Sequence, residues 1–462
     1  MSGCTAVSAP GKVLLAGGYL VLDRAYTALV FGLDSRIHVC IEPIRTRSGV
    51  TLSEIIVKSP QFLAAAWEYG YRLTEGGGGI AVTQLRASHD SSLDRNPFIE
   101  TALIYALTYI TATFPQAISP ASISILADQA YYSNPGTAPS STSQFLNFNV
   151  TLADAHKTGL GSSAALVTSF TAAMLSYYLP TDKFNVENEE GLRVLHNLSQ
   201  AAHCAAQGKV GSGFDIASAV YGSCLYRRFS PSLLSNMPEP GSPSFAKKLQ
   251  SLVEGDTWDT EIQKAAVQMP KGLRLIMCDV DCGSQTPGMV KQVLAWRQKN
   301  KEDADGIWAD LQTGNEALAR ELTSLATTGE QVGASDCAKL KDLFAKNRAL
   351  IRKMSVASKV PIEPPQQTAL LDACSNVSGV VGGVVPGAGG YDAIVVLLED
   401  KEEVFEELKR VLVAWKVDGE TDDDVKIGKV GMLGVREDMV GLRREDPSIY
   451  QQWIASGDDS ST

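Results

Sequence analysis

The chain has 462 residues, of which 44% are hydrophobic and 20% are charged, as in ordinary globular proteins. A chain of this length can bury a large core and more often forms two domains than one. Its formal net charge of −11 argues against a broad nucleic-acid-binding surface. No apolar run approaches the roughly 18 to 20 residues that span a bilayer, and the N-terminus lacks the pattern of a signal peptide. We therefore expect a cytoplasmic protein with neither nucleic-acid nor membrane partners.

The eight cysteines are scattered along the chain, and none forms a C-x-x-C motif. Many have apolar neighbours, which is more typical of reduced thiols in a cytosolic core than of a disulfide framework or a zinc site. Cys278 and Cys282 might suggest a metal site, but strand alternation places both thiols on one face, and the structural interpretation is favoured. We therefore expect reduced thiols.

In chain order, residues 13–16, 20–22 and 37–41 have the apolar character of short strands. From Pro97, the segment PFIETALIYALTYI carries apolar residues at helical spacing. Residues 131–143 are rich in Ser, Thr, Pro and Gly, which predicts a loop. The first part of the chain is thus expected to mix strands with helices.

The middle of the chain predicts a strand over 145–152, a Gly-rich turn, and a helix over 163–178. A second helix is predicted over 191–206, because its apolar residues form one stripe at a spacing of three to four. Residues 229–243 read FSPSLLSNMPEPGSP, and their four prolines make this segment the best candidate for a domain boundary.

Beyond that segment we expect a strand over 273–280 and long amphipathic helices to about residue 359. A Gly-rich run, GVVGGVVPGAGGYDAIVVLL, precedes a final helix over 402–415 and a strand-like end. Strands and helices mix without a repeating βαβ rhythm, which predicts an α+β fold with two domains.

The segment HKTGLGSSAAL is the sharpest candidate for a binding site. Gly159 and Gly161 permit backbone conformations and close approaches that a side chain would forbid. Ser162 and Ser163 stand where a helix begins, and the unpaired amides of a first helical turn suit phosphate groups. Lys157 can add a full positive charge, and a serine hydroxyl here can reach a phosphate-bound magnesium ion.

Three interpretations of this turn compete. A dinucleotide fingerprint should open a βαβ unit, yet the helix leads into YYLPTDKFNVENEEG, which is no parallel strand. The G-x-x-x-x-G-K-[ST] motif is absent, because Gly11-Lys12 and Gly208-Lys209 are each followed by valine. The turn alone therefore favours nucleotide phosphates only modestly over a simple capped helix.

Two further segments strengthen the nucleotide interpretation. In APGKVLLAGGY, a Pro-Gly turn is followed directly by Lys12, which by itself could be an ordinary surface lysine. In GKVGSGFDIASAVYG, glycines precede Asp215 and an apolar helical stretch follows it. An Asp at such a position is by default a helix cap.

Together these segments and VVPGAGGYD resemble the motifs of the GHMP kinase superfamily in their residues and in their order along the chain. The resemblance covers most of the chain. Within it the sequence is most similar to phosphomevalonate kinases, on NPFIETAL, AAHCAAQGKVGSGFD and CDVDCGSQTPGMV. The resemblance implies an N-terminal ATP-binding domain (1–228), a C-terminal substrate-side domain (229–462) and an active site in the cleft between them. It implies transfer of a phosphoryl group from ATP, with Mg²⁺, to 5-phosphomevalonate, in the mevalonate route to isoprenoids and sterols.

The resemblance also assigns residues. Lys12 and Asp215 would form the catalytic pair, Ser163 would bind the magnesium ion, and the 382–390 turn would close the site near the substrate. The ATP-binding candidates are Lys157, Thr158, Gly159, Leu160, Gly161, Ser162, Ser163 and Ala164. One position departs from the superfamily: mevalonate kinases carry a magnesium-binding glutamate where this chain has His203, and a neutral imidazole is a poor magnesium ligand.

The expected acceptor changes the chemistry. A phosphate monoester has a second pKa near 6 and is mostly a dianion at neutral pH, so it needs no base for activation. Repulsion between two polyanions becomes the main obstacle, and cations should dominate catalysis, with Asp215 mainly keeping Lys12 charged and oriented. The substrate-binding candidates are Tyr19, Lys209, Ser212, Gly213, Ser284, Thr286, Gly387 and Gly389, of which Lys209, Ser284 and Thr286 could equally serve turn structure.

Two other functions stay open. A mevalonate kinase or another small-metabolite kinase would keep the fold and change the acceptor. A non-catalytic regulator that binds ATP and a metabolite would be expected to lose a catalytic residue, whereas Lys12, Ser163 and Asp215 are all present. A hydrolase is disfavoured because neither G-x-S-x-G nor H-E-x-x-H occurs.

Overall fold

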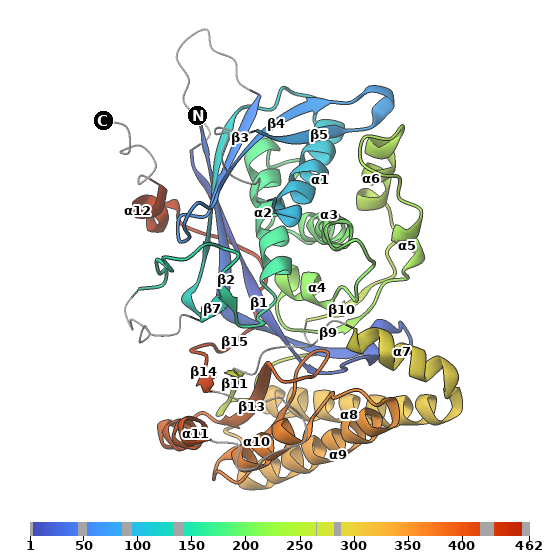
Figure 1. The fold of residues 1–462 in the computed structure, drawn as a ribbon, viewed down its shortest axis with the longest axis vertical. Coiled ribbons are helices and arrows are strands. Elements are labelled where there is room, and N and C mark those ends of the chain that lie inside the picture. Colours follow the sequence, from blue (N-terminus) through green and yellow to red (C-terminus); the bar gives the residue numbers. More distant parts are fainter. Residues whose placement is uncertain are drawn as a thin grey trace.

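The computed structural model describes residues 3–44, 53–85, 95–133, 143–264, 266–280, 288–415 and 429–454. Two sheets organise these residues (Figure 1). The larger sheet occupies the upper part of the view with helices on one side, and the smaller sheet lies below it against long helices. The predicted α+β fold is therefore confirmed.

The larger sheet runs in the order β10-β9-β2-β6-β3-β4-β5, with β1, β15 and β16 attached beside β2 and β1. Its pairs are antiparallel except β3 with β6. The strands are β1 Thr5–Ala16, β2 Ala28–Pro43, β3 Glu54–Lys58, β4 Ala66–Leu73, β5 Ile80–Leu85, β6 Ala121–Ala127, β9 Cys224–Arg227, β10 Glu261–Gln263, β15 Glu437–Asp438 and β16 Arg443–Arg444.

An irregularity in β1 matters for the site. The register of β1 against β2 shifts between Pro10 and Lys12, which is the signature of a β-bulge. Proline has no amide hydrogen, so a bulge is one of the few places where a paired strand can hold it. The bulge leaves the Lys12 amide to donate to the carbonyl of Leu160, at 3.0 Å, instead of to a strand.

A layer of helices covers one side of the larger sheet (Figure 1). Its members are α1 Pro97–Thr113, α2 Ser162–Tyr178, α3 Glu189–Gln207, α4 Phe214–Tyr221 and α6 Phe245–Glu254. The short helix α5 Ser232–Ser235 lies between β9 and α6 in the chain. Helix α2 packs on β1, β2, α1, α3 and α4, so it is the centre of the layer. Nearly all residues of α2 from Ala164 to Leu175 are buried. Because other elements surround the helix, it has no polar face.

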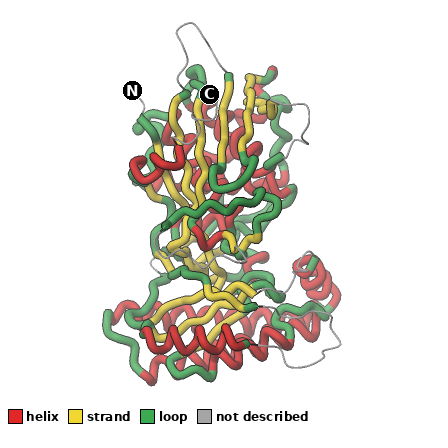
Figure 2. Tube along the Cα trace, turned by 60° about the vertical axis from the view of Figure 1, so that its left-hand side comes forward, coloured by secondary structure: helices red, strands yellow, loops and turns green. Residues whose placement is uncertain are grey.

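The smaller sheet has the order β12-β13-β11-β14, all antiparallel. In Figure 2 its strands lie against helices at the lower end of the molecule. The strands are β11 Leu273–Val280, β12 Val380–Val384, β13 Ala393–Glu399 and β14 Val430–Met432, and the helices are α7 Met289–Lys299, α8 Lys301–Thr328, α9 Ala334–Ser358, α10 Pro365–Ser375 and α11 Glu402–Ala414. Small elements complete the described chain: η1 Leu20–Leu22, η2 Glu75–Gly77, η3 Gln129–Tyr131, η4 Pro447–Tyr450, α12 Gln451–Ile454, and the pair β7 Tyr132–Ser133 and β8 His156–Lys157.

Two strand predictions are wrong. Residues 20–22 form a 3₁₀ turn, because Gly17 and Tyr19 both adopt positive φ angles, of 97° and 62°. Residues 145–152 form no strand beyond one isolated bridge between Leu63 and Thr151. There the large apolar residues are buried in core clusters without sheet pairing, and Asn149 has φ 55°, which interrupts an extended chain. The strand predicted over 273–280 and the helices predicted from residues 97, 163 and 191 are confirmed.

The expectation of reduced thiols is wrong for one pair. Cys4 and Cys40 form a disulfide, with Cα atoms 6.7 Å apart. Thr5 pairs with Ile41 and Ala6 with Cys40, so these cysteines are diagonal neighbours on one face of β1 and β2. Their separation of 36 residues gives no hint of this register. Among the described residues the other cysteines are free thiols, and Cys282 lies outside them.

The chain after the proline-rich segment returns to the larger sheet. It supplies β10, β15 and β16 to the sheet and α6 to the helical layer, as well as the whole of the smaller sheet. The division into 1–228 and 229–462 stays a prediction. None of the helices within the described ranges combines the length and the apolar character needed to cross a membrane.

Candidate active site

The Gly-rich turn before α2 is held open for a ligand. Gly159 and Gly161 have φ angles of 75° and 82°, in the left-handed region that favours glycine. Gly161 is also the N-cap of α2, and no side chain caps the helix. The first amides of α2 therefore remain available to an anion, and the positive end of the helix dipole points the same way.

The predicted ATP-binding residues divide into two groups. Lys157 is exposed, and Ser162 and Ser163 are half-buried, so their polar atoms can reach a ligand. Thr158 is buried and its hydroxyl donates to the carbonyl of Ala130 at 2.5 Å, while Leu160 and Ala164 are buried in the core. Thr158, Leu160 and Ala164 thus anchor the turn to the core. Their place in the sequence beside ligand-facing residues did not show that they face away from the ligand.

Lys12 lies directly against this turn. Its ammonium Nζ is 3.4 Å from the carbonyl oxygen of Gly159, and a Cβ on Gly161 would stand 2.8 Å from its Cε. Burial lowers the pKa of Lys12, and the charge of Asp215 acts in the opposite direction. The ammonium from β1 and the carboxylate from α4 are therefore close enough to interact electrostatically near the N-terminus of α2.

Asp215 and Ser163 are connected through a third residue. His203, on α3, places Nε2 at 3.1 Å from the Ser163 hydroxyl and Nδ1 at 3.9 Å from the Asp215 carboxylate. The ring is buried, with 2% of its surface exposed, and packs against Phe98 at a centroid distance of 5.7 Å. The position that breaks the superfamily pattern therefore lies between two predicted site residues.

The loop that leads to Asp215 is fixed from behind by β9 and the residue after it. Arg228 donates to the carbonyls of Val210 and Gly211, at 3.0 and 2.6 Å. The hydroxyl of Tyr226 donates to the carbonyl of Ser212 at 2.8 Å. The sequence analysis did not single out Arg228 or Tyr226, and the only signal for them was their place just after the loop and α4.

Gly213 shows how tight this arrangement is. It adopts φ 87° as the N-cap of α4, and a Cβ there would meet the Tyr226 hydroxyl at 2.6 Å. Lys209, just past the end of α3, is exposed, so its ammonium can reach an anion. Ser284 and Thr286 lie outside the described residues.

Tyr19 joins the first loop to the Gly-rich turn of the smaller-sheet region. Its hydroxyl donates to the carbonyl of Ala388 at 2.6 Å, and burial raises its pKa, which keeps the proton in place. A Cβ on Gly18 would stand 2.7 Å from the carbonyl oxygen of Gly387. Gly387 and Gly389 thus come together with Tyr19, and their φ angles of 69° and 80° shape the turn.

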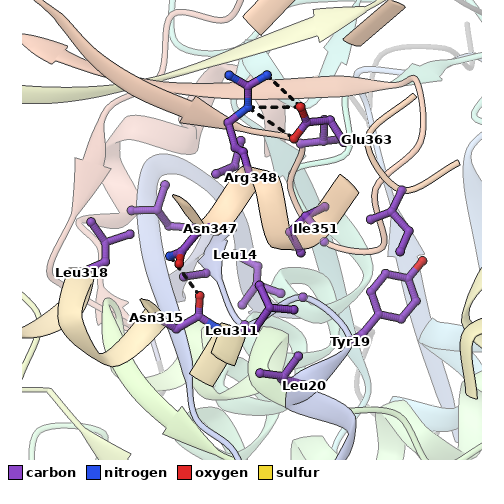
Figure 3. Close-up of a pocket in the computed structure, with 18 of the residues that line it drawn as sticks. Leu14, Tyr19, Leu20, Leu311, Asn315, Leu318, Asn347, Arg348, Ile351 and Glu363 are labelled. Carbon is purple, nitrogen blue, oxygen red and sulfur yellow. Dashed lines mark hydrogen bonds and ion pairs between the residues drawn. The ribbon is translucent and has the colours of Figure 1, made fainter. Parts of the chain in front are cut away.

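Behind Tyr19 lies a small cavity of about 50 Å³, shown in Figure 3. Arg348 pairs there with Glu363 at 2.7 Å, and Asn347 donates to Asn315 at 3.4 Å. Side chains of α8 and α9 face the first loop across this space. A space of this size holds water rather than a metabolite, so these residues support the loop that carries Tyr19.

A larger cavity, of about 250 Å³, borders the phosphate turn. Lys157, Ser162 and Ser163 line it beside mostly apolar walls that include Asn96, Pro97, Phe98, Tyr132, Phe62 and Trp67. Its position beside the first turn of α2 and its aromatic walls suit a flat base attached to phosphates. Phe62 and Trp67 gave no signal in the sequence because they are distant from the turn along the chain.

The oxygen atoms at the site fit a magnesium ion. The described residues contain no group of three or more His, Cys, Asp or Glu side chains that could hold a metal without help. Magnesium instead takes one or two protein oxygens together with phosphates and water, and Ser163 and Asp215 offer hydroxyl and carboxylate oxygens on either side of His203.

The chain is similar to known proteins over nearly its whole length. Residues 145–223 match the family model described as the GHMP kinases N terminal domain. The chain is 52% identical to the phosphomevalonate kinase ERG8 of Gibberella zeae over 454 residues, which cover 97% of this chain and 98% of that protein. It is 46% identical to phosphomevalonate kinase erg8 of Aspergillus fumigatus, with the same two coverages.

A solved structure shares the fold. The structure of the Streptococcus pneumoniae phosphomevalonate kinase in complex with phosphomevalonate and AMPPNP matches with a TM-score of 0.56 and 18% identity. The match covers 88% of this chain and 95% of that protein. At this identity the likeness concerns the fold alone.

Proposed function

Because the chain belongs to the phosphomevalonate kinase family, we propose that it transfers the terminal phosphoryl group of ATP to 5-phosphomevalonate. The products are 5-diphosphomevalonate and ADP, in the mevalonate route to isoprenoids and sterols. The observation that carries the proposal is the convergence of Lys12, Ser163 and Asp215 at an uncapped helix end, in a chain whose relatives match it over nearly their full length.

The phosphates of ATP would lie against the first turn of α2. The open amides of the turn and the charges of Lys157 and Lys12 supply the positive potential, and the 250 Å³ cavity would take the adenine. Magnesium would be held by Ser163 together with phosphate oxygens of ATP and water. When bound, the ion neutralises charge that develops on the transferred group.

The acceptor would enter from the side of Tyr19. Lys209, Ser212, Gly213, Gly387 and Gly389 would bind it there, together with Ser284 and Thr286. A phosphate oxygen of 5-phosphomevalonate is already ionised, so no proton has to be removed before it attacks. Lys12 therefore carries the main catalytic role, by stabilising charge at the transferred phosphoryl group, and Asp215 holds the ammonium charged in its buried setting.

An assay of ADP release with mevalonate and 5-phosphomevalonate side by side tests the proposal. ADP should form at a steady rate with 5-phosphomevalonate, and the product should carry two phosphates. Faster release with mevalonate would assign the acceptor to an alcohol. ATP binding without turnover on either compound would indicate a regulator in place of an enzyme.

For the location we propose the cytoplasm. Five of the seven described cysteines are free thiols, which are typical of a reducing compartment. Imaging of the full chain with a fluorescent tag tests this, and an organellar signal would contradict it.

A further inference from the structure

His203 is a buried histidine that the proposed mechanism does not yet use. It lies on α3, one turn before the helix ends at Gln207, and only 2% of its surface is exposed. Polar contacts surround both ring nitrogens, from α2 on one side and α4 on the other. A polar ring buried at a junction of three helices needs partners for both nitrogens, since an unpaired buried polar atom is costly.

The contacts favour one tautomer of the neutral ring. The amide nitrogen of Gln207 lies 3.4 Å from Nε2, and an amide nitrogen can only donate. We therefore assign Nε2 as an acceptor, whose single lone pair takes the Ser163 hydroxyl at 3.1 Å, while the longer Gln207 contact shares it. The hydrogen of the neutral ring is left on Nδ1, which faces the Asp215 carboxylate at 3.9 Å. This last contact is longer than a hydrogen bond and acts as an electrostatic attraction.

We propose that His203 is a positioning residue for phosphoryl transfer, which orients the Ser163 hydroxyl with Nε2 and the Asp215 carboxylate with its Nδ1–H. With its hydrogen directed to the ring, the hydroxyl of Ser163 turns its lone pairs away from the core, toward the phosphate turn. The Nδ1–H group attracts the carboxylate from the opposite side. One side chain on α3 thus couples the phosphate-binding helix α2 to the helix that carries Asp215.

A neutral ring suits this place better than a carboxylate for the proposed acceptor. Two multiply charged anions must approach each other here, and a second carboxylate beside Asp215 would add repulsion to both. Imidazole supplies one acceptor and one donor without a net charge. This advantage rests on the proposed function, whereas the contacts of His203 with Ser163 and Gln207 do not.

Nitrogen-15 NMR of the histidine side chains tests the tautomer directly. The chain has five histidines, and the signals that disappear in His203→Gln belong to this ring. We expect a neutral ring with its proton on Nδ1 in the protein without ligands. A ring protonated on Nε2 would overturn the proposal, whatever substrate the enzyme uses.

Kinetics of two variants test the positioning role. His203→Leu should lower kcat roughly 10- to 100-fold, the range for a lost hydrogen bond in a charged network, and should change the KM for ATP much less. His203→Gln keeps one acceptor and one donor, so it should recover most of the loss. His196→Gln is the matched control, because His196 is buried on the same helix and bonds Asn197 instead of a site residue. Wild-type kcat in a folded His203→Leu protein would overturn the proposal, and the NMR result stands even if that variant does not fold.

Discussion

The two sides of the site are built differently. The proposed ATP side consists of one short turn, residues 157–161, with the start of α2, and Lys12 reaches it from a distant part of the chain. The proposed acceptor side draws on segments that lie far apart in the sequence: the first loop at Tyr19, which bonds the turn around Gly387, and the loop before Asp215. A local motif thus specifies the binding of a common cosubstrate, whereas the choice of acceptor depends on tertiary structure.

This difference predicts that changes on the ATP side affect the chemical step and nucleotide binding, while changes on the acceptor side affect the second substrate. Lys12 is the exception, because its ammonium stands between the two sides.

The largest effect is expected for Lys12→Met. The variant loses the half-buried cation that we place at the transferred group, and removal of one such preorganised donor costs about 10²- to 10³-fold in kcat. Steady-state kinetics with both substrates measure the loss. Lys157→Met serves as the comparison, since that exposed lysine should mainly raise the KM for ATP. Equal losses of kcat in both variants would contradict the distinct role of Lys12.

A smaller loss, of roughly 10-fold or more in kcat/KM for ATP, is expected for Gly161→Ala. The new Cβ would stand 2.8 Å from the Lys12 Cε. The alanine would also have to adopt the left-handed φ of Gly161, which costs about 1–2 kcal/mol. Gly208→Ala is the matched control, because Gly208 has φ 66° but a Cβ added there would meet no atom within 4 Å. If both variants lose activity equally, backbone strain rather than contact with Lys12 explains the effect.

The smallest effect is expected for Tyr19→Phe, which removes the hydrogen bond to Ala388 and keeps the ring. A typical net hydrogen-bond contribution of about 1 kcal/mol corresponds to roughly a fivefold change, which should appear in the KM for the acceptor. The KM for ATP should stay as in the wild type. Tyr26→Phe, whose ring packs on Trp308, is the control, and a change confined to the KM for ATP would break the comparison between the two sides.

The sequence predicted the Gly-rich turn and the helix α2 after it because the information for them is local. Glycines at a turn, serines at a helix start and an apolar helix after them are properties of neighbouring residues. The approach of Lys12 and Asp215 was expected from the resemblance to a family and not from spacing. The structure adds the physical reason, which is the bulge at Pro10–Lys12 that releases the Lys12 amide to Leu160.

What the sequence did not provide depends on register and packing. The disulfide between Cys4 and Cys40 follows from how β1 pairs with β2, and His203 gained its partners only when α2, α3 and α4 came together. The predicted strand over 145–152 failed because alternation of apolar residues cannot distinguish a strand from a buried irregular segment. Such features need the tertiary arrangement before any chemical reasoning can use them.

We propose that cations, and not a general base, carry the transfer to a phosphate acceptor. Single-turnover rates of Asp215→Asn and Lys12→Met, measured with saturating ATP and 5-phosphomevalonate, distinguish the two mechanisms. We expect Asp215→Asn to retain clearly more activity than Lys12→Met, because the acceptor is already ionised. A far greater loss in Asp215→Asn would contradict it and would indicate that a proton must be removed from the acceptor.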